Sequence, residues 1–468
     1  MSDLCFLTAR EMQEHLRNKQ LSCEELVTVH LKQIEEVNPK VKAVVTLVAE
    51  QALEQARHAD SLIAKGEARG LLHGLPVLHK DLQETKGIRT TYGSSIYQNF
   101  VPDFDSLIVE RLKNAGAITL GKTNTPEFGA GSQTFNEVFG ETRNPYDLTK
   151  TCGGSSGGAA VALACGMTPL ADGSDMGGSL RNPASFCNVV GLRPSPGRVP
   201  SWPSNLGWFT LSVDGPMART VADVALMLAA LAGPDARSPI SIYEDGGKFL
   251  QPLERNFGGT RVAWVNFGLP FQNDVKEAVD AQRKVFEDLG CIVEDAEPDF
   301  NEADFIFRTL RAFSFAVSHE EHLERYRDKL KDTIIWNTEE GLKLSARDIS
   351  KTEVARTNFY QMTRKFMERY EFMILPTVQV LPFDIKQPYV SEINGVKMET
   401  YIDWMKSCYY VSTIGHPALS VPCGFVNGLP VGLQIVGRHQ DDLGVLQLGY
   451  MFEQATQFWK QRPSVAHS

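Results

Sequence analysis

The stretch Gly153-Gly154-Ser155-Ser156-Gly157-Gly158, followed later by Gly177-Gly178-Ser179, is the most informative part of this chain. Each segment places a serine among glycines, which permit backbone conformations with positive φ and leave the serine open to a ligand. Successive backbone N–H groups exposed in this way can point at one developing negative charge, as an oxyanion hole requires. Two such loops, each with a serine, favour nucleophilic catalysis on a carbonyl carbon.

The run from Gly153 to Gly157 also satisfies G-x-S-x-G, the nucleophile elbow of α/β-hydrolases. That motif follows a strand and needs a downstream histidine, but residues 147–152 are not an apolar strand. The candidate histidine bases lie in helical or ordinary loop patterns: His319, His322, His416 and His439. The elbow stays open as an alternative. A phosphate-binding loop is disfavoured because no Gly-Lys-Ser/Thr closes the glycine run.

A serine nucleophile without a convincing histidine needs another base, and a lysine can serve if burial lowers its pKa toward neutrality. Lys80 ends a short apolar strand pattern over residues 75–79 and is followed by Asp81 and a polar loop. We therefore regard Lys80 as a candidate base.

Bulk properties describe an ordinary globular protein. The 468 residues are 43% hydrophobic and 22% charged, and the net charge of −10 disfavours nucleic-acid binding. The eight cysteines are scattered and form no C-x-x-C pair, which favours free thiols in a reducing compartment. Without a signal-peptide pattern at its start, the chain is expected to be cytoplasmic. The uncharged stretch 151–171 is expected to be a buried helix rather than a membrane span.

Strand and helix patterns alternate along the chain, which predicts an α/β fold around a largely parallel or mixed sheet. Capping boxes at Thr8 and Ser22 predict two early helices, the second ending before Pro39. Further helices are predicted over residues 50–65, 106–115, 220–232, 274–289 and 442–456. Further strands are predicted over residues 117–121, 262–265, 291–293, 372–375, 419–423 and 431–436.

Several segments together resemble the amidase signature family, in the family's order and over nearly the whole chain. They are Gly74–Asp81, Gly121–Phe128, Gly153–Arg198, Gly215–Thr220 and Gly428–Gln434. The resemblance implies one large α/β domain over residues 1–468, with a mixed, mostly parallel twisted sheet covered by helices on both faces. Its expected parts are a helical segment (1–65), a catalytic core (66–235) and a remainder of sheet and covering helices (236–468).

The resemblance also implies a Ser-cisSer-Lys triad without metal or organic cofactor. Ser179 would be the nucleophile, Ser155 a bridging serine on a cis peptide, and Lys80 the base. The oxyanion donors would be the backbone N–H groups of Met176, Gly177, Gly178 and Ser179. The implied reaction is hydrolysis of small-molecule amides, anilides, carbamates or esters through an acyl-enzyme.

Substrate contacts are expected in two regions. The segment 128–132, with Gly129 and Gly131, resembles the family loop whose backbone faces the substrate amide. Trp202, Trp208 and Phe209 fall in the variable stretch where family members build their pockets, although core packing is an equal alternative. An aromatic pocket would favour an apolar or aryl substrate.

Two other functions remain open. The glutamine amidotransferase subunit of tRNA-dependent amidation has the same triad, but it carries an aspartate where this chain has Met405. A non-catalytic scaffold would be marked by loss of a triad residue, and all three residues are present. The resemblance permits a homodimer, and we expect neither a membrane nor a nucleic-acid partner.

Overall fold

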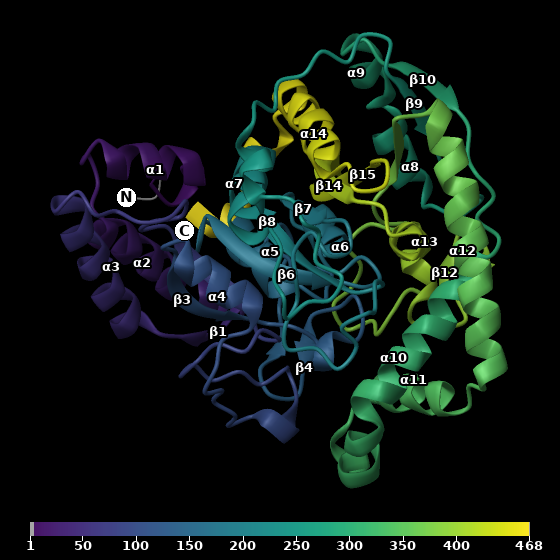
Figure 1. The fold of residues 1–468 in the computed structure, drawn as a ribbon, viewed down its shortest axis with the longest axis horizontal. Helices are drawn as coiled ribbons and strands as arrows, with labels where there is room; N and C mark the ends of the chain where they lie inside the picture. Colours follow the sequence, from purple (N-terminus) through teal and green to yellow (C-terminus); the bar gives the residue numbers. More distant parts are fainter. Residues whose placement is uncertain (1–3, 468) are drawn as a thin grey trace.

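The computed structural model describes residues 4–467, and one eleven-stranded sheet runs through them (Figure 1). From one edge to the other, the strands are β1 (Val44–Leu47), β3 (Ile118–Thr123), β2 (Pro76–Lys80), β6 (Leu170–Asp175), β8 (Val213–Ala218), β7 (Val190–Arg193), β14 (Ala418–Val426), β15 (Leu429–Val436), β11 (Phe372–Pro376), β9 (Arg261–Trp264) and β10 (Ile292–Asp295). Two short hairpins pair β4 (Phe135–Asn136) with β5 (Gly140–Glu141), and β12 (Glu392–Ile393) with β13 (Val396–Lys397).

Strand directions in the large sheet are mixed. Parallel pairs occur in two groups of three strands, β3-β2-β6 and β11-β9-β10. The strands between these groups, from β6 through β8, β7, β14 and β15 to β11, pair antiparallel. The α/β class and the single mixed sheet agree with the prediction from sequence, and the parallel pairing is confined to these two groups.

Helices cover both faces of the sheet. They are α1 (Ala9–Arg17), α2 (Cys23–Val41), α3 (Ala49–Ala64), α4 (Leu107–Asn114), α5 (Gly157–Ala164), α6 (Arg181–Phe186), α7 (Val221–Leu231), α8 (Asn273–Asp280), α9 (Arg283–Asp288), α10 (Ala303–Tyr326), α11 (Asp332–Leu342), α12 (Ala346–Arg369), α13 (Lys406–Ile414) and α14 (Asp442–Thr456). Helices α5 and α6 pack on one face, and α7 and α14 pack on the other. Figure 1 shows α1–α3 at one end of the molecule and α10–α12 at the opposite end.

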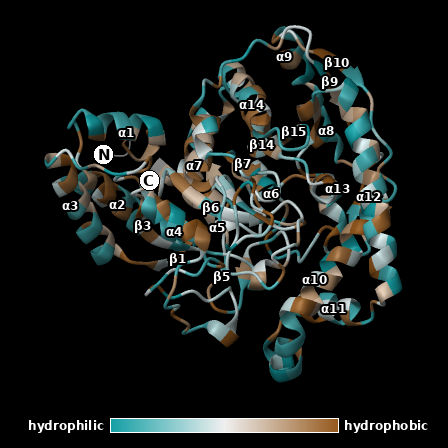
Figure 2. Cartoon of the chain, viewed as in Figure 1, coloured by the Kyte–Doolittle hydropathy of each residue, from teal (hydrophilic) through white to brown (hydrophobic). Residues whose placement is uncertain are grey.

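Hydropathy follows these layers (Figure 2). The outer helices α3 and α12 carry long hydrophilic stretches, whereas α7, beside the sheet, is mostly hydrophobic. All eight residues of α5 are buried, so the uncharged stretch 151–171 contains a core helix, as expected, followed by the start of β6. Among the helices of residues 4–467, none is both long enough and apolar enough to cross a bilayer.

Several predicted boundaries need correction. Helix α2 continues through Pro39 to Val41, because the fixed φ of proline is itself helical and only one hydrogen bond near the helix end is lost. The helix predicted over 274–289 is two helices, α8 and α9. Both capping boxes are present, at Thr8 and Ser22, and all eight cysteines are free and buried.

Candidate active site

Lys80 lies at the carboxyl end of β2, beside the parallel strand β6. Its backbone N–H donates to Asp172 Oδ1 at 2.8 Å, and the ring of the preceding His79 is held between Asp172 and Thr119. This network fixes the strand end from which the Lys80 side chain projects. The carboxyl ends of parallel strands are where α/β sheets bind their ligands.

The Lys80 amine is surrounded by hydroxyl groups. Its Nζ lies 2.7 Å from Ser155 Oγ, 2.9 Å from Ser156 Oγ and 3.1 Å from Ser174 Oγ. Burial lowers the pKa of Lys80 to about 7, although Asp214, Asp175 and Asp172 oppose this shift. A lysine with such a pKa is partly neutral at physiological pH and can accept a proton there.

The loop that carries Ser155 is tightly held. The peptide bond between Gly154 and Ser155 is cis. The hydroxyls of Ser132 and Thr134 donate to the carbonyls of Gly154 and Gly153 at 2.7 and 2.8 Å. Helix α5 follows the loop, but no strand of the described chain directly precedes it, so the strand-turn-helix context of a nucleophile elbow is missing.

The loop that carries Ser179 follows β6 and is organised by Asp175. The Asp175 carboxylate accepts hydrogen bonds from the N–H groups of Gly178 (2.9 Å) and Leu180 (3.1 Å), and it pairs with the buried guanidiniums of Arg181 and Arg193. Burial alone would raise the pKa of Asp175, but these two arginines hold it well below its usual range. The loop geometry is therefore fixed by a buried charge network.

Gly178 illustrates how close the packing around this loop is. Its φ is +112°, and a Cβ added there would lie 2.5 Å from Cys408 Cβ and 2.7 Å from Asn182 Nδ2. The two serine loops also touch, since Ser156 N–H donates to the Ser179 carbonyl at 3.2 Å. The side chain of Ser179 is half-buried, which leaves it partly accessible.

Four backbone N–H groups were expected to face an oxyanion. The Gly178 N–H donates to Asp175 and is therefore engaged. Within residues 4–467, the N–H groups of Met176, Gly177 and Ser179 have no hydrogen-bond acceptor. Three donors in one turn can bind a single negative charge.

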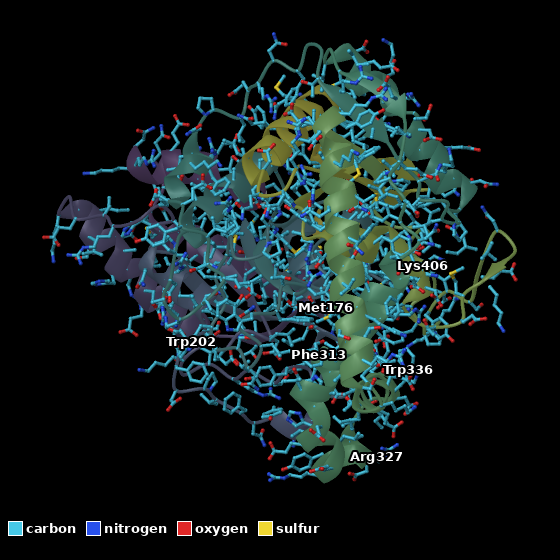
Figure 3. All side chains as sticks on the ribbon, turned by 45° about the vertical axis from the view of Figure 1, so that its right-hand side comes forward. Met176, Trp202, Phe313, Arg327, Trp336 and Lys406 are labelled. Atoms are coloured by element: carbon cyan, nitrogen blue, oxygen red, sulfur yellow. The ribbon has the colours of Figure 1, made fainter. Side chains whose placement is uncertain are left out.

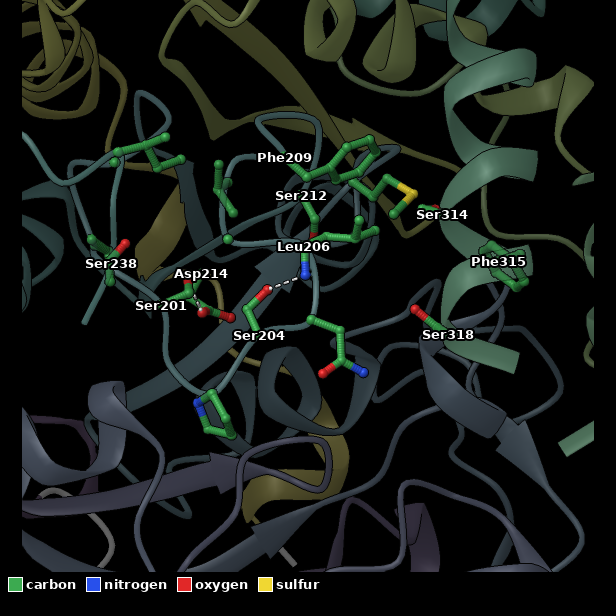
Figure 4. A pocket seen from close by; sticks show the side chains of 18 of the residues that line it. Ser201, Ser204, Leu206, Phe209, Ser212, Asp214, Ser238, Ser314, Phe315 and Ser318 are labelled. Carbon is green, nitrogen blue, oxygen red and sulfur yellow. Dashed lines mark hydrogen bonds between the residues drawn. The ribbon is translucent and has the colours of Figure 1, made fainter. Parts of the chain in front are cut away.

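A cavity of about 370 Å³ opens beside Met176 and Phe128 (Figure 4). In the figure, Ser314, Phe315 and Ser318 of α10 lie across from the loop that carries Ser201, Ser204, Leu206 and Phe209. Asp214 lies on its floor and accepts a hydrogen bond of 2.6 Å from Ser201. We call this the α10 cavity.

The three aromatic residues after Pro200 behave differently from one another. Phe209 lines the α10 cavity, as the sequence suggests. Trp208 is 78% exposed and does not line it. Trp202 packs edge-on against Phe104 and beneath the Arg237 guanidinium, so it too lies outside the cavity lining. Exposed tips and surface cation–π pairs cannot be told from pocket walls by sequence alone.

The two glycines of the segment 128–132 face different surroundings. Gly129 lies beside Ser155, since a Cβ added there would be 3.6 Å from Ser155 Oγ. Gly131 lines a second cavity, of about 470 Å³, between this segment and α11. We call it the α11 cavity. Figure 3 labels Met176, which lines the α10 cavity, and Trp336, which lines the α11 cavity.

The histidines do not contact the serines. His319 lines the α10 cavity and lies 3.3 Å from His322, nitrogen to nitrogen, while His416 bonds to the Gly437 carbonyl. Burial lowers the pKa of His319 to about 3 and that of His416 to about 4. In the described part of the chain, no group of three or more His, Cys, Asp or Glu side chains is arranged to hold a metal ion.

Sequence reasoning missed several residues of this site. Ser156 and Ser174 share the Lys80 amine with Ser155, and Asp175 organises the Ser179 loop. A paired serine and an aspartate between two glycine runs are weak signals. Their roles depend on the approach of loops that lie far apart in the sequence.

Comparison with known proteins agrees with this arrangement. The family described as Amidase matches residues 25–446. An acylamidase from Rhodococcus erythropolis is 34% identical over 469 residues, covering 99% of this chain and 98% of the relative. The catalogue of relatives also includes one subunit of a glutamyl-tRNA(Gln) amidotransferase, from Caldanaerobacter subterraneus subsp. tengcongensis. It is 35% identical over 485 residues, covering 97% of this chain and 98% of the relative.

Among solved structures, a bacterial aryl acylamidase of the amidase signature enzymes superposes with a TM-score of 0.91 at 29% identity, covering 97% of this chain and 98% of that one. A 6-aminohexanoate cyclic dimer hydrolase superposes with a TM-score of 0.89 at 26% identity, covering 98% and 99%. The chain therefore belongs to the amidase signature family of enzymes, which hydrolyse amide carbon–nitrogen bonds.

Proposed function

We propose that this enzyme hydrolyses small-molecule carboxamides, including anilides, through an acyl-enzyme on Ser179, with Ser155 as proton relay and Lys80 as base. The observation that carries the proposal is the buried Lys80 amine, whose pKa is about 7, at 2.7 Å from Ser155 Oγ. A buried amine in this state can accept a proton through a serine hydroxyl at neutral pH.

The mechanism begins with neutral Lys80 drawing a proton from Ser179 through Ser155. The Ser179 oxygen attacks the amide carbonyl, and the oxyanion is stabilised by the backbone N–H groups of Met176, Gly177 and Ser179. The relay then returns the proton to the leaving nitrogen, and the C–N bond breaks. Water attacks the acyl-enzyme by the same route in reverse and releases the acid.

One proposed donor is reassigned. The Gly178 N–H already donates to Asp175, which supports a structural role for it rather than direct contact with the oxyanion. Fixed donors of this kind are effective because they need no reorganisation during the reaction.

The substrate would extend into the α10 cavity, beside the oxyanion donor Met176. Phe128, Leu206, Phe209 and Phe315 give this cavity apolar walls, which supports an aryl or alkyl group there. Its volume of about 370 Å³ suits a small molecule better than a polypeptide. Esters of the same acids should also react, because an ester leaves more easily from the same tetrahedral intermediate.

A direct test is a panel of aryl amides, aliphatic amides, carbamates and esters, assayed with the wild type and Ser179→Ala. We expect hydrolysis of at least the aryl amides, and its loss by several orders of magnitude in the variant. Ser391→Ala, at an exposed serine, is the matched control. Hydrolysis that persists in Ser179→Ala would overturn the assignment.

A second candidate function is that of the glutamyl-tRNA(Gln) amidotransferase relative, which is favoured by the identity of 35% to that protein. Met405 counts against it, because a buried thioether, 3.9 Å from Asn182 Nδ2, cannot bind the glutamine amine as an aspartate does. Release of ammonia from free glutamine, at rates matching those for aryl amides, would favour this second function.

A further inference from the structure

The α11 cavity lies next to the catalytic loops but on the other side of the segment 128–133 from Ser155. Its walls include Gly131, Ser132, Lys331, Trp336, Tyr401 and Trp404. Ser132 joins it to the site, because its hydroxyl donates to the Gly154 carbonyl at 2.7 Å and accepts from Asn182 Nδ2 at 2.8 Å. The cavity is therefore one residue away from the cis peptide of Ser155.

Lys331 places an ammonium group inside this cavity without a counter-ion. Within residues 4–467, its Nζ makes no hydrogen bond and no ion pair, and it lies 4.1 Å from the centroid of the Phe135 ring. A Cβ added at Gly131 would lie 3.9 Å from this nitrogen, so the ammonium group reaches the catalytic end of the cavity. Burial lowers the pKa of Lys331 to about 8, which leaves most molecules charged at pH 7.

The nearby carboxylates do not neutralise Lys331 directly. Glu127 accepts hydrogen bonds from the Lys331 backbone N–H and from Ser94, and it makes no ion pair with Nζ. Asp332 and Glu399 line the cavity but are exposed at its rim, where solvent and salt screen them. The positive charge is thus deep in the cavity and the negative charges are at its mouth.

A second unpaired cation lies behind the same wall. Arg311 is only 5% exposed, and its Nη2 donates to Tyr401 Oη at 2.7 Å while its Nε has no partner. The other buried arginines Arg181, Arg193 and Arg198 all pair with carboxylates. In the described chain, Arg311 has no ion pair, and its other hydrogen bond goes to the Met176 thioether. A guanidinium has five donors, so several remain unused.

Buried cations without counter-ions are costly unless a ligand supplies the charge. Aromatic walls from Phe135, Trp336, Tyr401 and Trp404 suit a planar or apolar group next to that charge. We propose that the α11 cavity receives a carboxylate-bearing part of the amide substrate, and that Lys331 is the residue that selects it. This inference rests on the proposed amidase function and adds a substrate class to it.

The test compares matched substrates that differ only in charge. One pair is N-(4-nitrophenyl)succinamate and its neutral succinamide, with the charge on the acyl part. The other pair is 4-acetamidobenzoate and 4-acetamidobenzamide, with the charge on the amine part. We expect the wild type to prefer the carboxylate member of at least one pair by about tenfold in kcat/KM, the size of a charged hydrogen bond.

Lys331→Met should lower kcat/KM for that carboxylate at least about tenfold more than for its neutral partner, mainly through KM. Lys331→Arg should restore most of the preference, which a merely structural role would not predict. Lys343→Met, at an exposed lysine just after α11, is the matched control.

A preference for the neutral member of both pairs, or an equal loss for both members in Lys331→Met, would overturn this inference. Neither result affects the proposed function, because the neutral amides still report on Ser179. If Ser179→Ala retained hydrolysis of the neutral amides, the proposed function itself would fail.

Discussion

The Lys80 amine and the Ser155 hydroxyl lie 2.7 Å apart in a pocket where the lysine is fully buried. Burial disfavours the ammonium form, and the resulting pKa of about 7 lies well below the usual value of 10.5. This pair gives the protein a base that works near neutral pH without histidine.

The first prediction concerns pH. Because the base must be neutral to accept a proton, kcat/KM should rise with pH through a midpoint near 7 and level off above it. Lys80→Met should lower kcat/KM by about 100- to 10,000-fold and remove this limb. A pH–rate profile from about pH 5 to about pH 10 measures both effects. A midpoint near the ordinary lysine value of ~10.4 would contradict the buried neutral amine.

The second prediction concerns the other hydroxyls around the amine. Ser174 Oγ accepts a hydrogen bond from Lys80 Nζ at 3.1 Å, which stabilises the charged form. Ser174→Ala should therefore shift the midpoint of the pH profile down, by about one pH unit. Its activity at high pH should fall far less than that of Ser155→Ala. An upward shift would mean that the hydroxyl does not stabilise the ammonium.

The third prediction concerns the charge network below the Ser179 loop. Asp175→Asn would leave the buried Arg181 and Arg193 without their shared carboxylate. Breaking such a buried pair costs about 3–5 kcal/mol of unfolding free energy. Denaturant unfolding should show this loss, whereas Asp288→Asn, in the exposed pair with Lys284, should leave the midpoint unchanged. Equal effects of the two changes would contradict the network's role.

The fourth prediction concerns the backbone at Gly178. An added methyl group would meet Cys408 and Asn182 at a φ of +112°, which L side chains rarely adopt. Gly178→Ala should shift the loop and lower kcat more than it raises KM, because oxyanion donors act in the transition state. Gly258→Ala, at an exposed glycine, is the control. A fully active Gly178→Ala enzyme would show that this loop tolerates displacement.

Much of the fold was predictable because its helices and strands carry local signals. The capping boxes at Thr8 and Ser22, the Asn427-Gly428 turn between β14 and β15, and helix α14 all match their sequence patterns. The long helices α10–α12 were not predicted, since their polar outer faces obscure the apolar stripe that packs inward. The antiparallel centre of the sheet also depends on long-range pairing that no local pattern specifies.

The candidate site divides in the same way. Glycine-flanked serines and a lysine after an apolar strand are visible in sequence, as at Ser155, Ser179 and Lys80. The position of Lys331 opposite Gly131 is not, because it requires the start of α11 to pack against a loop far earlier in the chain. The difference between Phe209 and the exposed Trp208 is likewise set only by tertiary packing.

The central claim, that Ser179 is the nucleophile and Ser155 the relay, is tested most directly by locating a covalent adduct. A fluorophosphonate should modify wild-type enzyme at Ser179, as read by peptide mass spectrometry. Ser155→Ala should still be labelled at Ser179, but more slowly, because only the proton relay is lost. An adduct on Ser155 would contradict the account and would mean that the two serines have exchanged roles.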